Sequence, residues 1–277
     1  SLLVFLFLQA FRGTVKASAN FKASADAEVL HKAMKGLGTD EAAILQLLTA
    51  RSNAQRQEIK ASYKTLFGKD LVHDLKGELG GKFETLVVAL MTPPLTYDVT
   101  SLHHAIKGAG TDEKVLVEIL ASRTPQQVKD IIAALFKAGE QKYGTDEQSF
   151  ITILGNRSAE HLRKVFDAYT KLSGYEMEES IKRETSGSLR ALLLAVVKCA
   201  RSVPSYFAET LYYAMKGAGT DDDTLIRVMV TRCEVDMLDI RAAFRRMFAC
   251  SLHSMIKGDT NGDYRKTLLL LCGGDDA

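Results

Sequence analysis

Apolar residues recur at helical spacing in four segments of this chain that resemble one another. Each segment opens with a threonine, at residue 39, 111, 145 or 220, and an apolar residue follows five and nine positions later. Two apolar positions four apart lie on one face of an α-helix, so each segment is predicted to be an amphipathic helix with that face buried. The apolar pairs are Ile44 and Leu48, Leu116 and Leu120, Phe150 and Leu154, and Leu225 and Met229.

The ends of these helices carry signals of their own. The threonine is predicted to be the N-cap, because its hydroxyl can accept a hydrogen bond from a backbone N–H of the first turn. Twelve positions after it, every segment has an arginine, which is expected in the last helical turn, where positive charge suits the helix dipole. The four arginines are Arg51, Arg123, Arg157 and Arg232.

Three of the four segments continue with one further pattern. A second amphipathic stretch (54–67, 159–171, 236–248) leads through a short connecting helix to a closing apolar helix (83–91, 189–199, 264–272). Together with a helix before each turn, such as residues 26–35, this predicts about five helices per repeat and no strand. The predicted fold class is therefore all-α, an array of five-helix repeats.

A glycine-rich turn connects the first two helices of every repeat. Lys-Gly-x-Gly-Thr-Asp occupies residues 35–40, 107–112 and 216–221, and a looser copy runs over 142–146. In three copies an acidic residue stands forty positions after the second glycine, and in the remaining copy that position is Phe150. The three acids are Glu78, Glu184 and Asp259.

Glycines that adopt positive φ can turn several backbone carbonyls toward one point. Calcium prefers such carbonyls together with a bidentate carboxylate, so turn and acid predict a calcium site. The alternative, a plain helix–helix turn, would suffice for one copy, but three acids at one distance favour the metal. Phosphate-loop and EF-hand patterns do not fit these turns.

The spacing between turns is uneven. From Thr39 to Thr111 is 72 residues and from Thr145 to Thr220 is 75, whereas Thr111 and Thr145 are only 34 apart. Roughly forty residues are therefore missing from the end of the second repeat and the start of the third. Two outcomes are open: a hybrid helix that joins Gln127 to Lys137, or an unstable truncated product with impaired calcium sites.

Composition narrows the function. The formal net charge of +2 argues against a nucleic-acid partner. Four widely spaced cysteines fit neither a zinc site nor a disulfide framework, and reduced thiols favour the cytoplasm. No nucleophile has a base in a recognisable arrangement, so we expect no enzymatic activity and no small-molecule substrate. The apolar start, residues 1–11, is interpreted as non-native.

The motif M-K-G-x-G-T-D, with an acid forty positions on in helical repeats of about seventy residues, resembles the annexin family from Phe11 onward. The resemblance implies an annexin-type array of about three and a half five-helix repeats instead of four. We expect a short N-terminal tail over residues 1–15, repeat 1 over 16–92, a truncated repeat 2 over 93–130, repeat 3 over 131–201 and repeat 4 over 202–277.

The resemblance also implies calcium-dependent binding to acidic phospholipids, above all phosphatidylserine. Several Ca2+ ions would bridge loop carbonyls and a carboxylate to lipid phosphates, in a membrane scaffold with anticoagulant-type shielding of lipid. Carried over position by position, the metal ligands are Met34, Gly36, Gly38 and Glu78 in repeat 1, Gly139, Lys142, Gly144 and Glu184 in repeat 3, and Met215, Gly217, Gly219 and Asp259 in repeat 4.

The partner implied is an acidic phospholipid membrane surface, with self-association on membranes. The expected location is cytoplasmic, and peripheral on membranes when calcium rises, with an extracellular role open even without a signal peptide. Met34 and Met215 are either core residues or membrane contacts. The competing hypothesis is an α-helical protein-interaction scaffold whose calcium loops no longer assemble.

Overall fold

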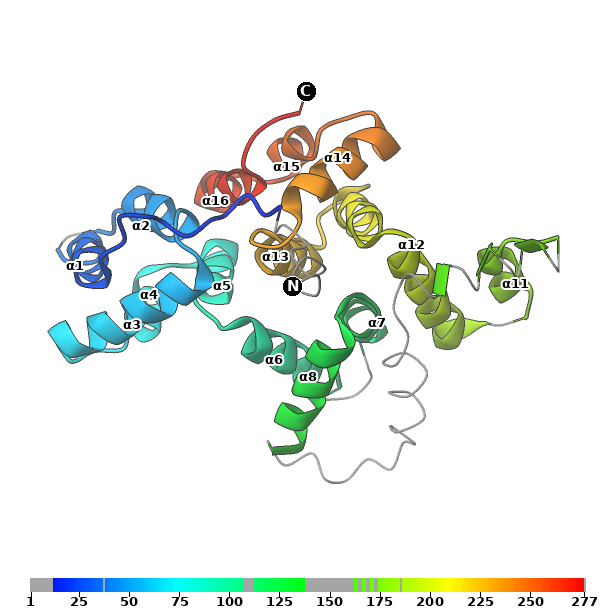
Figure 1. Cartoon of the computed structure of the whole chain (residues 1–277). Helices are drawn as coiled ribbons and strands as arrows, with labels where there is room; N and C mark the ends of the chain where they lie inside the picture. Colours follow the sequence, from blue (N-terminus) through cyan, green and yellow to red (C-terminus); the bar gives the residue numbers. More distant parts are fainter. Residues whose placement is uncertain are drawn as a thin grey trace, which may run out of the picture. The chain divides into compact units, whose positions relative to one another are not determined.

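The computed structural model describes residues 12–36, 38–106, 112–137, 162–163, 166–167, 170–171, 174–184 and 186–276. Within these ranges all regular secondary structure is helical, which confirms the predicted all-α class (Figure 1). The start that we interpreted as non-native and the looser third turn lie outside the described residues. The helices are α1 (Ala23–Ala33), α2 (Glu41–Thr49), α3 (Asn53–Phe67), α4 (Leu71–Glu78), α5 (Gly81–Leu90), α6 (Pro94–Ile106), α7 (Glu113–Ser122), α8 (Pro125–Lys137), α11 (Met177–Glu184), α12 (Gly187–Met215), α13 (Asp222–Arg232), α14 (Met237–Phe248), α15 (Leu252–Asp259) and α16 (Gly262–Cys272).

The chain forms two compact units. Unit 1 combines residues 1–93 with 207–277, so it holds the first and the last of the predicted repeats. Unit 2 is the continuous segment 94–206, with α6, α7, α8, α11 and the first part of α12. Residues that are far apart in sequence therefore share one core in unit 1, where α16 packs on α2 and α13 packs on α5.

Helix α12 is apolar and 29 residues long, which by length and composition is enough to cross a membrane. Its backbone leaves the helical conformation at Ser202, two residues before Pro204, so it consists of two helices joined at a kink. Neither part reaches the ~20 residues that a transmembrane helix needs. Phe207 and Leu211, in the second part, are fully buried within the protein, which gives the apolar residues there a core role.

The helices after the glycine turns begin one residue later than the threonines suggested. Asp40, Asp112 and Asp221 are the N-caps of α2, α7 and α13, and their carboxylates accept hydrogen bonds from backbone N–H groups of the first turn. The predicted caps at Thr39, Thr111 and Thr220 are therefore wrong, and Thr145 lies outside the described residues. The carboxylate that follows is better placed for the orphan N–H groups, and it adds negative charge at the positive end of the helix dipole.

Three of the arginines predicted for the helix ends make ion pairs, and Arg157 lies outside the described residues. Arg51 binds Asp26 through two nitrogens, at 2.6 and 3.0 Å, and this hydrogen bonding raises the pKa of the guanidinium. Arg123 binds Asp98 in the same way, at 2.7 and 2.8 Å. Both partners lie 25 residues before their arginine. In the last repeat that position is Phe207, and the corresponding arginine instead pairs with an acid four residues on.

Within unit 1, a buried arginine connects the first repeat to the last. The side chain of Arg56 is 1% exposed and donates to the carbonyl oxygen of Leu90 at 2.6 Å and to Glu234 at 3.0 Å. Glu234 also accepts from the backbone N–H of Asn53, the first residue of α3, at 2.7 Å. Burial lowers the pKa of the Arg56 guanidinium, so the charged group depends on these partners.

The segment before α1 adds a second connection between the same repeats. The N–H groups of Arg12 and Val15 donate to the carbonyls of Val235 and Cys233. Further along, the backbone of Ser18 exchanges two hydrogen bonds with the amide of Gln55. A Cβ at Gly13 would lie 2.4 Å from the Glu234 backbone, so only glycine permits this close approach. The segment therefore contacts both halves of unit 1.

One helix crosses the junction between the predicted second and third repeats. Helix α8 runs without interruption from Pro125 to Lys137. This matches the first of the two outcomes predicted for the junction, a hybrid helix. Ile131, on that helix, is buried in a small core with Leu102 and Ile119. The junction helix thus supplies part of the apolar surface that covers α6 and α7.

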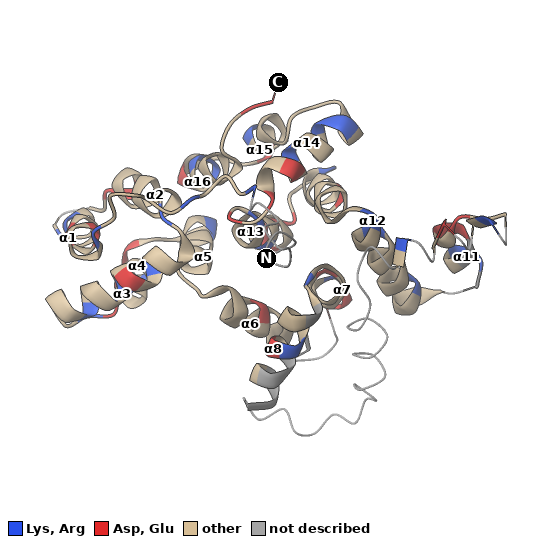
Figure 2. Ribbon diagram, viewed as in Figure 1, with Lys and Arg blue, Asp and Glu red and all other residues tan. Residues whose placement is uncertain are grey.

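Several described helices carry charges that suit the helix dipole. Acidic residues gather at the start of α11, where Glu176 and Glu178 pair with Arg201, and basic residues close α14 (Figure 2). Acids near a helix N-terminus and bases near a C-terminus both suit the dipole. Charges that break this rule therefore stand out, and the most conspicuous are acids at the ends of short helices.

Candidate calcium site

The first glycine turn follows α1, and a backbone hydrogen bond to the end of that helix closes it. Met34 is the C-cap of α1, and Gly36 and Gly38 have φ angles of +123° and +91°. The backbone N–H of Asp40 then donates to the carbonyl of Ala33 at 2.8 Å and closes the turn. A Cβ at either glycine would meet no atom within 4 Å. The backbone conformation, and not space, calls for glycine here.

The acid forty residues later meets this turn. Glu78 is the last residue of α4, and its Oε2 accepts a hydrogen bond of 2.6 Å from the hydroxyl of Thr39. Helix α4 is set in place at its other end by Asp70, whose carboxylate caps the backbone N–H of His73. The tertiary structure thus brings the acid and the glycine turn together.

The turn of the last repeat has the same geometry. Gly217 and Gly219 have φ angles of +116° and +92°. The N–H of Asp221 donates to the carbonyl of Ala214 at 2.7 Å and closes the turn. Asp259, the last residue of α15, accepts a hydrogen bond of 2.5 Å from the hydroxyl of Thr220. Two copies far apart in sequence therefore arrive at one arrangement.

For the third repeat the structure describes the helix that carries the acid. Gly139, Lys142 and Gly144 lie outside the described residues, and of Glu184 only the backbone is described. Glu184 ends α11, a helix of eight residues, as Glu78 and Asp259 end α4 and α15, also of eight. A glycine with φ near +60° stands three residues after each acid, namely Gly81, Gly187 and Gly262.

An acid at the end of a helix is unfavourable by itself. The helix C-terminus carries partial negative charge, so a carboxylate there costs about 0.3–1 kcal/mol where a cation would be favoured. Glu78 and Asp259 both stand in this position, and each has a hydroxyl donor as its hydrogen-bond partner. A bound cation would relieve the repulsion, which is a physical reason to expect a metal at these ends.

The donor set suits a hard cation held mainly by carbonyls. In the described part of the chain, no group of three or more His, Cys, Asp and Glu side chains could hold a metal. A site at these turns would therefore combine main-chain oxygens with one carboxylate, which calcium accepts and softer metals do not favour. The positive-φ glycines and the returning acid fit calcium.

Methionines next to two of the turns belong to the core. Met34 is 9% exposed and Met215 is 3% exposed. Of the two alternatives left open for these side chains, burial in the core is confirmed. Only the main-chain oxygen of either residue remains as a metal ligand.

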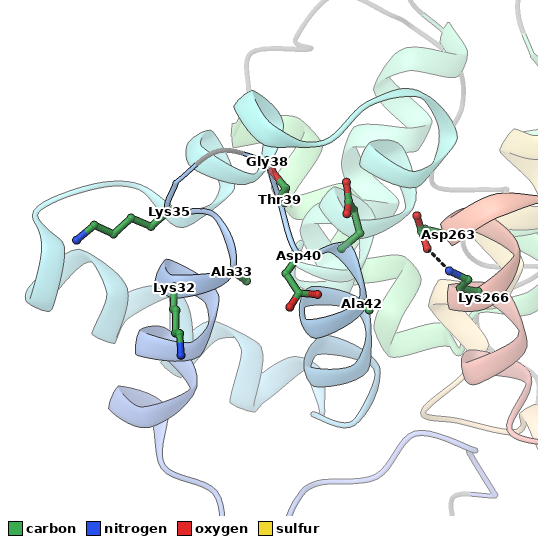
Figure 3. A pocket seen from close by; sticks show the side chains of 10 residues that line it. Lys32, Ala33, Lys35, Gly38, Thr39, Asp40, Ala42, Asp263 and Lys266 are labelled. Atoms are coloured by element: carbon green, nitrogen blue, oxygen red, sulfur yellow. Dashed lines mark hydrogen bonds and ion pairs between the residues drawn. The ribbon is translucent and has the colours of Figure 1, made fainter.

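Two open hollows adjoin these turns within unit 1. One, of about 550 Å³, lies beside the first turn and includes Lys32, Lys35 and Lys266 in its lining (Figure 3). In Figure 3 the first two lysines extend away from one another, and Lys266 pairs with Asp263 at 2.8 Å. The lysines supply positive charge near the turn without converging on one point.

The second hollow, of about 600 Å³, is lined by both hydrogen-bonded acids, Glu78 and Asp259. Tyr264 lies in its wall and donates to Asp222 at 2.9 Å, and burial together with this bond raises the pKa of its phenol. Lys82, also in the lining, pairs with Asp223 at 3.2 Å. The acidic ends of α4 and α15 thus line one acidic hollow.

Sequence reasoning missed the two threonines that hold the acids. We assigned Thr39 and Thr220 as helix caps, whereas their hydroxyls donate to Glu78 and Asp259. The available signal was the pair of hydrogen-bonding residues, Thr and Asp, at the end of every turn. Either residue type can cap a helix, so the sequence could not tell which of the two does so.

The chain resembles one family of known proteins over four segments. The annexin family profile matches residues 25–90, 97–134, 132–196 and 206–271. The second of these matches is much the shortest, and it ends within the junction helix α8. The four matches cover most of the chain.

Motifs at residues 12–15, 52–59 and 268–273 resemble annexin V first and the annexin VIII type next. The chain is similar to annexin A5 of Gallus gallus, with 58% identity over 315 residues that cover 96% of this chain and 98% of the relative. Because this chain has 277 residues, at least 38 of those aligned positions have no residue here. This fits the shortened second match.

Solved structures show the same fold. A K16A mutant of annexin A8 is 46% identical, with a TM-score of 0.85 over 96% of this chain and 99% of that one. Calcium-bound annexin (Sm)1 is 32% identical, with a TM-score of 0.83 over 96% of this chain and 94% of that one. The repeat fold is therefore similar to that of a relative whose structure contains calcium.

Proposed function

This chain belongs to the annexin family, for which calcium-dependent phospholipid binding is characteristic, and we propose that it binds acidic phospholipid membranes through calcium at its glycine turns. The observation that carries the proposal is the pairing of turn and acid in two repeats. In each, a threonine hydroxyl at the end of the turn holds a carboxylate that lies forty residues after the second glycine.

The proposed ligands in repeat 1 are the carbonyls of Met34, Gly36 and Gly38 with the carboxylate of Glu78. In repeat 4 they are the carbonyls of Met215, Gly217 and Gly219 with Asp259. Calcium takes about six to eight oxygens, so the protein leaves positions for water or lipid phosphate. A bound ion would supply positive charge that attracts an anionic headgroup.

The third repeat would contribute a further site through Gly139, Lys142, Gly144 and Glu184. The place of Glu184 at the end of an eight-residue helix supports this proposal. Nearby lysines such as Lys35 would add attraction of about 1 kcal/mol each near an anionic surface. The second turn has no acid of its own and would bind calcium most weakly.

We further propose that the protein is cytoplasmic, moves to membranes when calcium rises, and coats phosphatidylserine as a scaffold. Shielding of lipid from other proteins, as in anticoagulant action, and self-association on the membrane would follow from such a coat. Annexins are in general membrane-binding proteins without catalytic activity, which agrees with our expectation for this chain.

The test combines Glu78→Gln, Glu184→Gln and Asp259→Asn in one variant. Loss of three carboxylates should abolish co-sedimentation with phosphatidylserine vesicles in calcium, while the circular dichroism spectrum stays unchanged. A control with the same change in charge replaces exposed acids elsewhere, Glu28→Gln, Glu58→Gln and Asp130→Asn, and should bind as the parent does. Undiminished binding by the first variant contradicts the proposal. Calcium-independent capture of a protein partner without vesicle binding would instead support an interaction scaffold.

A further inference from the structure

Two threonine hydroxyls in unit 1 occupy equivalent positions, and each donates a hydrogen bond to an acidic side chain. Thr39 donates to Oε2 of Glu78 at 2.6 Å, and Thr220 donates to Oδ2 of Asp259 at 2.5 Å. Both bonds span 39 residues of sequence. They are therefore tertiary contacts that tie the glycine turn to the end of a separate helix.

The neighbouring aspartates leave the threonines available for this contact. Asp40 and Asp221 cap α2 and α13 through hydrogen bonds of 2.9 and 3.1 Å to backbone N–H groups. Both helices are therefore capped without the hydroxyls. In a plain helix–helix turn the threonine could cap the helix or face solvent. Here Thr39 and Thr220 both donate to an acid instead.

The chemistry of a carboxylate explains what such a bond would do. Each oxygen has two lone-pair positions, so Oε2 of Glu78 can accept from Thr39 and still face a cation. Hydrogen bonds to a metal ligand from outside the metal shell orient that ligand, and their loss typically lowers metal affinity about 10–100-fold. Glu78 is exposed and has a flexible side chain, so a hydrogen bond that orients its carboxylate matters most at this acid.

We propose that Thr39 and Thr220 are positioning residues, which hold Glu78 and Asp259 over their turns before calcium arrives. This rests on the proposed function, because it assumes that the two acids bind calcium. The contact also offsets part of the repulsion between each acid and the end of its helix. In repeat 4 the hydroxyl of Thr220 also lies 3.4 Å from the backbone carbonyl oxygen of Asp259. The larger effect is expected at Thr39, because Glu78 is exposed whereas Asp259 is half-buried.

The experiment isolates the first site. In a background of Glu184→Gln and Asp259→Asn, Thr39→Val removes the hydroxyl while keeping the shape of the side chain, and Thr39→Ser keeps the hydroxyl. Calcium chloride is titrated calorimetrically into the full chain without lipid, and melting temperature is measured in chelator. We expect Thr39→Val to weaken calcium binding about 10–100-fold, Thr39→Ser to restore it, and all melting temperatures to agree closely. Thr65→Val, at an exposed helical threonine whose hydroxyl donates to the carbonyl of Ala61, is the matched control and should change neither quantity.

The outcomes separate this proposal from the one it rests on. If the background protein with Thr39 intact takes up no calcium, the turn is not a calcium site and both proposals fail there. If it binds calcium and Thr39→Val binds as tightly, only the positioning role is overturned. A fall in melting temperature that the serine variant shares would show a structural role instead, and Thr220→Val in a Glu78→Gln, Glu184→Gln background repeats the test independently.

Discussion

The first repeat and the shortened second repeat close their turns in the same way but differ in the size of their apolar cores. Both turns close with the same backbone bond, from Asp40 to Ala33 and from Asp112 to Ala105, each at 2.8 Å. Repeat 1 continues through α3, α4 and α5, and fifteen of its apolar residues form one buried cluster. The corresponding cluster of α6, α7 and α8 has five among the described residues.

The difference shows which features are local and which are not. Closure of the turn and capping of the next helix need only the residues on either side, so both survive in the second repeat. The carboxylate arrives on α4, and the second repeat has no equivalent of that helix before the junction. The shortened repeat therefore keeps the glycine motif in its sequence but has no acid forty positions after it, and its cluster of buried apolar residues is smaller among the described residues.

The largest effect is expected when a buried isoleucine is shortened to alanine in each of the two unequal cores. Ile44 and Ile119 are both fully buried. Ile44→Ala should lower the free energy of unfolding of unit 1 by about 2–5 kcal/mol, because its large core leaves a cavity. Ile119→Ala should cost less, since the smaller core collapses more easily around the gap. Urea unfolding followed by circular dichroism measures both, and equal losses would contradict the comparison.

A smaller effect is expected where the first and last repeats join. Glu234→Gln keeps the shape of the side chain but leaves the buried Arg56 guanidinium with carbonyl partners only. We expect a loss of about 1–3 kcal/mol from unit 1, with no change in unit 2, measured by the same unfolding curves. The exposed pair Lys266 and Asp263 serves as the control, because such pairs contribute about 0–1 kcal/mol. An equal effect of Asp263→Asn would contradict the buried role of Glu234.

The smallest effects should be equal in the two repeats. Asp40→Ala and Asp112→Ala each remove an N-cap, at a cost of about 1 kcal/mol in the unit concerned. Because capping is local, the shortened repeat should lose as much as the complete one. Thermal melts of the two variants provide the measurement. A markedly larger loss for Asp112→Ala would show that the second turn depends on distant packing after all.

Much of the fold followed from periodic patterns. Apolar residues at helical spacing predicted the helices, and the spacing of Thr111 and Thr145 predicted the junction that α8 crosses. The sequence pattern did not show which of two chemically similar residues takes a given role. Thr39 and Asp40 can both cap a helix, and Met34 suits both a core and a membrane contact, so neighbours in space had to decide.

By itself, the sequence determined the repeats, the helical class and the forty-residue interval between turn and acid, because these depend on order along the chain. The tertiary structure decided that a threonine, and not an aspartate, holds each described acid, and that the first and last repeats share one unit. It also decided that Arg56 is neutralised by a glutamate 178 residues away. Contacts between distant residues depend on how helices pack, and packing is set by the combined shape of many side chains that no single motif records.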